Sequence, residues 1–122
     1  MNAFPFLAPS DLFPGEGLDL NGYLVRNRAA TFLFTVKGDA MSGVGILPGD
    51  KVLVDRALDA RHGDIVVAAV AGEYTLKRLW LKAERAALLP ENPAHAPISF
   101  GDGTELQVWG VMVGLVRHYR RK

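Results

Sequence analysis

The residues between positions 36 and 50 constrain the fold most, because they place turn formers and acidic residues between two apolar, strand-like runs. Gly38 and Gly43 permit backbone conformations that a side chain would disfavour. The sequence Leu-Pro-Gly-Asp at 47–50 is typical of a turn, in which proline presets one dihedral and glycine takes the positive one. The chain is therefore expected to reverse here, and we interpret this segment as a functional site.

The rest of the chain has the pattern of strands joined by short turns. Strands are predicted over 31–36, 51–55, 64–70 and 73–81, with a short edge strand over 88–90, a loop over 94–99 and a long final strand over 106–116. The run 64–70 is almost continuously apolar, so we expect it to be buried on both faces. Ala71 and Gly72 predict a two-residue hairpin, and Gly110 and Gly114 indicate bends or a bulge.

These strands, with almost no helix between them, predict a mainly β, compact and strongly twisted body. Prolines and aromatic residues are mixed over residues 1–17, which predicts an extended arm whose apolar side chains dock on a surface. Asp19 is placed to cap a short helical turn over 19–25. We therefore divide the chain into an N-terminal arm with this turn, residues 1–29, and a domain of residues 30–122.

Composition narrows the classes of function. A chain of 122 residues with 49% hydrophobic and 22% charged residues suits one folded domain. The formal net charge of +1 provides no general attraction to nucleic acid, so we expect DNA to be reached only through partners. The absence of cysteine excludes disulfides and thiolate chemistry and fits a reducing cytosol. No signal peptide and no apolar run of about 18 residues is present, so a cytoplasmic location without membrane contact is expected.

Lys77 is a candidate functional residue because of its place in the predicted strand over 73–81. Strand alternation puts Lys77 on the face of Thr75 and Leu79, whereas Arg78 lies on the opposite face. One arrangement keeps Arg78 near solvent along Trp80 and turns Lys77 inward, where desolvation would lower its pKa and make it a usable base. Without other information, a lysine in a strand is more often an ordinary solvated side chain.

Several short motifs resemble those of the LexA/UmuD family of self-cleaving Ser-Lys peptidases, and the resemblance extends from about residue 19 to the final strand. The motifs are Gly-Asp-Ala-Met at 38–41, Gly-Asp at 49–50, His-Gly-Asp-Ile-Val at 62–66 and Glu-Tyr-Thr-Leu-Lys-Arg-Leu at 73–79. The resemblance implies a LexA/UmuD-like peptidase fold. It places Ala40 where the family has its nucleophilic serine, Lys77 at the general base, and the amides of Ala40 and Met41 as oxyanion donors.

An alanine methyl group cannot attack a carbonyl, so we expect no self-cleavage from this chain. Either the serine was replaced by engineering or the lineage lost it. The N-terminal residues contain no Cys-Gly or Ala-Gly cleavage dipeptide and resemble an already processed member of the family, which favours natural loss. Ser42 is a poor substitute nucleophile, because a residue two positions along a turn directs its hydroxyl elsewhere.

The remaining polar residues are interpreted as structural. The histidines His62, His95 and His118 have no metal-ligand or triad spacing, and neither a metal nor a cofactor is implied. Carboxylates at predicted turns and strand ends are expected to cap backbone amides; these are Asp39, Asp50, Asp55 and Asp64. The basic residues in 117–122 are interpreted as a solvated tail.

The resemblance further implies a UmuD-like accessory subunit of an error-prone translesion DNA polymerase in the SOS response to DNA damage. Its expected partners are a second copy of the chain in a homodimer, a UmuC-like polymerase subunit and the RecA filament. Two alternatives stay open. One is an engineered Ser-to-Ala form of a self-cleaving peptidase, and the other is the C-terminal dimerisation and autocleavage domain of a LexA-like repressor.

Overall fold

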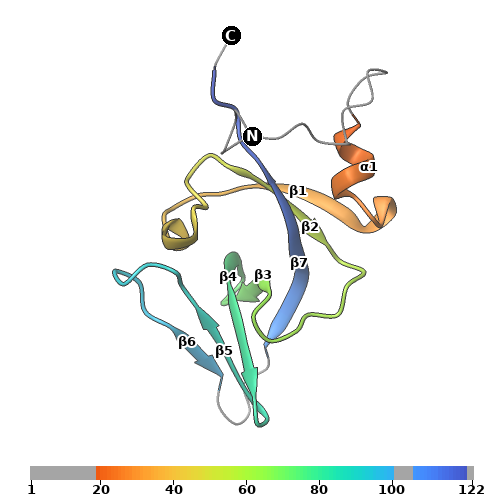
Figure 1. Ribbon diagram of the computed structural model, residues 1–122. Helices are drawn as coiled ribbons and strands as arrows, with labels where there is room; N and C mark the ends of the chain where they lie inside the picture. The colour runs from red at the N-terminus through yellow and green to blue at the C-terminus, as the bar shows by residue number, and fades with distance from the viewer. Residues whose placement is uncertain (1–18, 101–105, 121–122) are drawn as a thin grey trace, which may run out of the picture.

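A computed structural model describes residues 19–100 and 106–120, which form one seven-stranded sheet in the order β1-β2-β7-β3-β4-β5-β6 (Figure 1). The elements are α1 (Leu20–Leu24), the 3-10 turns η1 (Arg28–Ala30) and η2 (Ser42–Val44), β1 (Thr31–Thr35), β2 (Lys51–Asp55), β3 (Ile65–Val70), β4 (Glu73–Lys82), β5 (Arg85–Leu89), β6 (Ile98–Phe100) and β7 (Gln107–Val116). All neighbouring strands are antiparallel. The predicted mainly β, strongly twisted body is confirmed. None of the helices in the described segments has the length and apolar character needed to cross a membrane.

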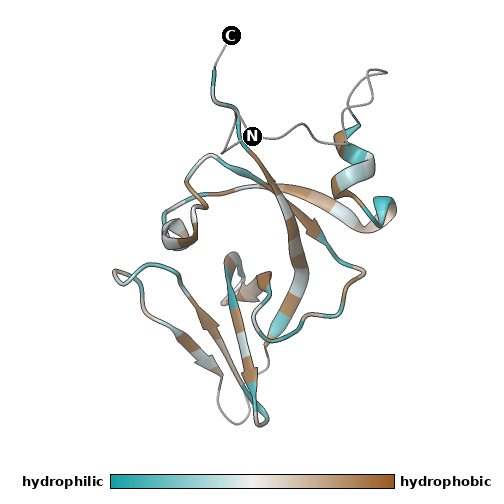
Figure 2. Ribbon diagram, viewed as in Figure 1, coloured by the Kyte–Doolittle hydropathy of each residue, from teal (hydrophilic) through white to brown (hydrophobic). Residues whose placement is uncertain are grey.

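The sheet buries a hydrophobic core on each side of β3. Val66 belongs to one core together with Leu79 and Leu88, whereas its neighbour Val67 belongs to the other, which also contains Met41. Successive residues of a strand point to opposite faces, so β3 is buried on both, as its apolar run predicted. Figure 2 shows hydrophobic residues along the strands and more hydrophilic ones in the connecting loops.

The predicted helical turn after residue 18 is confirmed as α1. The Asp19 carboxylate accepts a hydrogen bond from the Gly22 amide (2.9 Å) and so caps the helix. Leu24 lies over β7 at Gly114, where a Cβ would come within 3.2 Å of the leucine side chain. The predicted extended arm of residues 1–17 lies outside the described residues, and the division between residues 29 and 30 stays a prediction.

The glycine positions have the effects that the sequence predicted. Ala71 and Gly72 both take positive φ angles, 52° and 81°, and join β3 to β4 as a two-residue hairpin. The register of β7 shifts at two places, next to Gly110 against β3 and next to Gly114 against β2. These shifts are the expected irregularities, and they bend β7 where it crosses the middle of the sheet.

Two predictions in the region 85–100 are wrong. The short edge strand over 88–90 is the strand β5, which starts at Arg85 and lies between β4 and β6. The expected loop over 94–99 contains the start of β6. Alanine, which occupies two of the five positions of β5, has low strand propensity, and β6 has only three residues, so neither strand produces a periodic signal. Pairing of β5 with β4 and of β6 with β5 imposes the extended conformation.

Candidate functional site

The candidate site is a pocket of about 400 Å³ between the turn that follows β1 and the first half of β4. Ala40 and Met41 line it from the turn, and Lys77 lines it from β4. The structure therefore brings together the three residues that the sequence singled out, although Lys77 is far from the other two along the chain. The pocket also contains apolar side chains from β1, β2, β3 and β4: Phe34, Val52, Val67, Tyr74 and Leu76.

The turn is held in place by one buried side chain and by its glycines. Met41 is only 2% exposed and packs into the core beside β2 and β3, which anchors the turn to the sheet. Gly38 and Gly49 have φ angles of +79° and +91°, a conformation that favours glycine. The amide of Gly49 donates to the carbonyl oxygen of Val36 (2.8 Å), which closes the turn. The turn predicted over 47–50 is thus confirmed.

The backbone amides of this turn fall into two groups. The amide of Ser42 donates to the Asp39 carbonyl oxygen (3.1 Å), and that of Gly43 donates to the Glu91 carbonyl oxygen (2.7 Å). Within residues 19–100 and 106–120, the amides of Ala40 and Met41 have no hydrogen-bond acceptor. Two consecutive unpaired donors at a pocket are chemically suited to bind an oxyanion or a carbonyl oxygen.

Lys77 lies half-buried in the pocket, which corresponds to the arrangement in which its side chain turns inward. Its ammonium group donates a hydrogen bond to the Thr75 hydroxyl on the same face of β4. Burial lowers the pKa of Lys77 below the ordinary value of a lysine, because desolvation disfavours the charged form. Lys77 pairs with Val66 of β3 on one edge of β4, whereas pairing with β5 on the other edge begins only at Arg78. Lys77 therefore lies on a part of β4 that β5 leaves uncovered, where it lines the pocket together with the turn.

Arg78 makes contacts that the sequence did not predict. Its side chain is partly exposed, and its Nε donates to a carboxylate oxygen of Glu91 (3.0 Å). Its Nη1 donates to the carbonyl oxygen of Gly63 (2.8 Å). The guanidinium thus connects β4 to two loops, which a single lysine ammonium could not do with the same fixed geometry.

Three of the four aspartates cap backbone amides, as predicted. Asp50, Asp55 and Asp64 accept hydrogen bonds from the amides of residues 47, 57 and 61, at 2.7, 2.8 and 2.8 Å. The exception is Asp39, whose carboxylate pairs with the Nε2 atom of His95 (2.7 Å). This contact lowers the pKa of Asp39 below its ordinary value.

Arg117 is not part of a solvated tail, so the interpretation of the C-terminal basic residues is wrong for this residue. Its guanidinium contacts both carboxylate oxygens of buried Asp50 (2.7 and 2.6 Å) and donates to the Gly45 carbonyl oxygen (2.6 Å). The pair lowers the pKa of Asp50 to about 2. Arg117 therefore fastens the end of the turn to the end of β7.

The remaining histidines and Ser42 do not enter the pocket. His62 is exposed and accepts the amide of Leu81 through Nδ1 (3.0 Å), and His118 is exposed. Ser42 does not line the pocket; its hydroxyl accepts a hydrogen bond from Asn92 (3.3 Å). Among the described residues, no group of three histidine or carboxylate side chains lies close enough to hold a metal ion.

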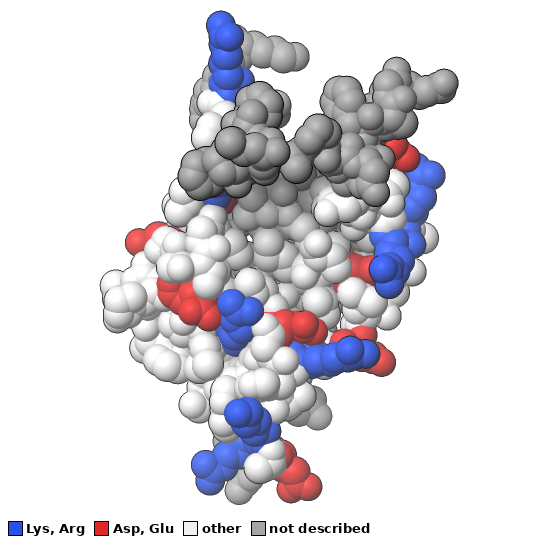
Figure 3. All heavy atoms as spheres, viewed as in Figure 1, with Lys and Arg blue, Asp and Glu red and all other residues white. Residues whose placement is uncertain are grey.

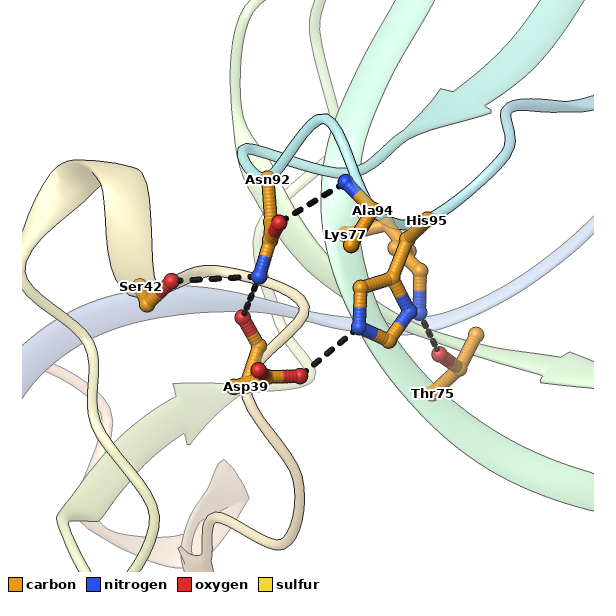
Figure 4. Close-up of polar contacts among 7 residues, drawn as sticks. All are labelled: Asp39, Ser42, Thr75, Lys77, Asn92, Ala94 and His95. Atoms are coloured by element: carbon orange, nitrogen blue, oxygen red, sulfur yellow. Dashed lines mark hydrogen bonds and ion pairs between the residues drawn. The ribbon is translucent and has the colours of Figure 1, made fainter.

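Sequence reasoning missed the loop between β5 and β6, residues 90–97. Glu91, Asn92 and His95 all contact the turn that carries Ala40. Figure 4 shows the contacts of Asn92 and His95 with Asp39. The only signal for them is the sequence Pro-Glu-Asn-Pro at 90–93, which indicates a turn but not what the turn touches.

A second pocket, of about 490 Å³, lies beside α1 and is lined by residues 22–26, Asp55, Leu58 and Val113. Its one buried carboxylate is fully used, because Asp55 accepts hydrogen bonds from Asn27 (2.8 Å) and from the Ala57 amide (2.8 Å). Because this carboxylate is engaged in structural hydrogen bonds, we place the chemistry at the pocket of Lys77.

On the face shown in Figure 3, the charged side chains of the described residues do not form a continuous basic surface. Blue and red side chains are interspersed there. Among the described residues, this face therefore offers no basic footprint for the phosphate backbone of nucleic acid, in agreement with the formal charge of +1.

Comparisons with known proteins identify the family of the chain. The family model described as Peptidase S24-like matches residues 5–113. The chain is 44% identical to the protein SamA of Salmonella typhimurium over 94% of its own length and 79% of SamA. It is 48% identical to LexA repressor 1 of Xanthomonas campestris and 39% identical to the LexA repressor of Bordetella petrii, over 83% and 93% of the chain. It spans about half the length of these two repressors (52% and 49%). The chain thus belongs to the Peptidase S24-like family, the LexA/UmuD family that its short motifs indicated.

Proposed function

We propose that this protein is a UmuD-like accessory subunit of an error-prone translesion DNA polymerase in the SOS response, with alanine at the peptidase nucleophile position. The proposal rests on one observation, that Ala40 and Lys77 line the same pocket. The amino group of Lys77 has Thr75 as its hydrogen-bond partner there. The arrangement has a base of lowered pKa and two unpaired amides, but it presents a methyl group where a nucleophile would stand.

Ala40 cannot perform the first step of peptide cleavage by a Ser-Lys pair. In a Ser-Lys peptidase, the serine oxygen bonds to the peptide carbonyl carbon, the neutral lysine takes the hydroxyl proton, and that proton passes to the leaving amine. Ala40 has no lone pair and no proton to give, so neither the first bond nor the first transfer takes place. The protein therefore acts by binding its partners and cleaves nothing through this pocket.

The partners that we propose are a second copy of the chain, a UmuC-like polymerase subunit and the RecA filament. DNA is reached through them, which is supported by the near-neutral charge of the chain. The 44% identity to SamA, which extends over 79% of that protein's length, also supports the proposal.

Reconstitution of lesion bypass tests the proposal. A UmuC-like subunit, a RecA filament and a primed template with an abasic site are mixed with the chain, and primer extension past the lesion is measured. We expect bypass to depend on the chain and to be unchanged in Lys77→Ala, because cleavage is not part of the function. A UmuC-like subunit that neither co-purifies with the chain nor gains bypass from it would contradict the proposal.

A second candidate is the C-terminal domain of a LexA-like repressor, including a form whose serine was replaced. The identity of 48% over about half of a LexA repressor favours it. The same co-purification discriminates the two, because a repressor domain would pair with its own copies and leave the polymerase subunit unbound.

A further inference from the structure

The loop of residues 90–97 holds the turn that carries Ala40 through an oriented side-chain amide. Asn92 Nδ2 donates to the Asp39 carbonyl oxygen (2.9 Å) and to the Ser42 hydroxyl (3.3 Å) (Figure 4). The other end of the same amide is fixed, since Oδ1 accepts the amide of Ala94 (2.9 Å). Both ends of the Asn92 side chain are therefore engaged, one with its own loop and one with the turn.

Backbone contacts place the same loop against Ala40 itself. The Glu91 amide donates to the Ala40 carbonyl oxygen (2.8 Å), and the Gly43 amide donates to the Glu91 carbonyl oxygen (2.7 Å). The approach is so close that a Cβ on Gly43 would lie 2.3 Å from that carbonyl oxygen. The turn thus rests directly on the backbone of Glu91.

The loop is also tied to the strand of the lysine. The Glu91 carboxylate binds Arg78, the residue after Lys77, and Arg78 in turn donates to the Gly63 carbonyl oxygen. One residue, Glu91, therefore contacts the turn of Ala40 by its backbone and the strand of Lys77 by its side chain. Any displacement of this loop changes how the two sides of the pocket face each other.

We propose that Asn92 and Glu91 are positioning residues, which fix the Ala40–Met41 turn at its place opposite Lys77. This inference deepens the proposed function, because it concerns the same pocket and rests on that pocket being the family site. It assigns a role to a loop outside the short motifs at 38–41 and 73–79. Neither residue touches a substrate; each acts through the turn or through Arg78.

The test is Asn92→Asp in the native chain, followed by the backbone amide signals of residues 39–43 and the titration of Lys77 in NMR spectra. The substitution keeps an oxygen for the Ala94 amide and removes the donor that holds the turn. At neutral pH we expect the amide signals of residues 39–43 to shift. We also expect the pKa of Lys77 to rise toward its ordinary value, because a displaced turn admits water.

Acid should reverse the change in this variant. A protonated aspartic acid at position 92 has an O–H that can again donate to the Asp39 carbonyl oxygen, so the signals return toward their native positions as pH falls. Asp39 and His95 are ionisable groups at the same turn. The native chain measured over the same pH range therefore supplies the baseline. A merely structural residue would not show this recovery.

Asn92→Ala serves if the aspartate variant does not fold, since it removes the donor without adding a charge. Unchanged signals for residues 39–43 in a folded variant would overturn the proposal. In an Ala40→Ser background that cleaves, Asn92→Ala should lower kcat roughly 10- to 100-fold with little change in KM. The NMR result needs no cleavage, so a failure of the positioning role is distinguishable from a failure of the proposed function.

Discussion

Replacement of Gly43 by alanine tests how tightly the turn of Ala40 rests on the loop of residues 90–97. The added Cβ would lie 2.3 Å from the Glu91 carbonyl oxygen, which is backbone and cannot rotate away. Separation to an ordinary contact of about 3.5 Å requires a movement of roughly 1.2 Å. That movement stretches two hydrogen bonds, from Gly43 to Glu91 and from Glu91 to Ala40, which are now 2.7 and 2.8 Å long.

The expected loss of stability follows from these contacts. Two hydrogen bonds contribute about 1–3 kcal/mol net, and alanine recovers about 0.4–1 kcal/mol by restricting the unfolded chain. The free energy of unfolding should therefore fall by about 1–2 kcal/mol, which for a domain of this size lowers Tm by roughly 4–8 °C. Urea unfolding at 25 °C and a thermal melt measure the two quantities.

Gly22→Ala is the matched control. Its Cβ would meet the Asp19 carboxylate at 2.5 Å, but that group is the end of an exposed side chain and can move. We expect a change within about 1 kcal/mol, because the gain in helix propensity offsets the weakened cap. If Gly43→Ala unfolds at the same urea concentration as the native chain, the close contact with Glu91 does not hold the turn, and the reasoning is refuted.

Three further outcomes are expected. Ala40→Ser should cleave a target peptide of a cleavable relative, with a rate that rises with pH as Lys77 loses its proton and a midpoint below that of an ordinary lysine; a folded variant that cleaves at no pH, as judged by gel analysis, argues that more than the serine is missing. Arg117→Gln should lower the free energy of unfolding most near neutral pH, because the pKa of Asp50 is held at about 2. The stabilisation by the Asp50–Arg117 pair is complete above about pH 4 and is lost as pH falls toward 2. Equal urea midpoints of the variant and the native chain at pH 7 would contradict this expectation. Sedimentation at micromolar concentration should show a dimer, since the edge strand β1 exposes 61% of Leu33; a monomer throughout would exclude it.

Local patterns determined most of the strands. β2 has the predicted bounds, and the hairpin at Ala71 and Gly72 follows from its two-residue turn, because alternation and turn chemistry act over a few residues. The strands β5 and β6 were misjudged, since their extended conformation depends on partners elsewhere in the sheet. The order of the strands, with β7 between β2 and β3, is not contained in any local pattern.

The candidate site divides in the same way. The sequence by itself determined the residue types at positions 40 and 77, and alternation along β4 determined that Lys77 and Arg78 face opposite sides. Only the tertiary structure decided that these two positions line one pocket and that Asn92 and Glu91 hold its turn. The physical reason is that these contacts join residues far apart along the chain. They form only when the order and register of the strands bring those residues together.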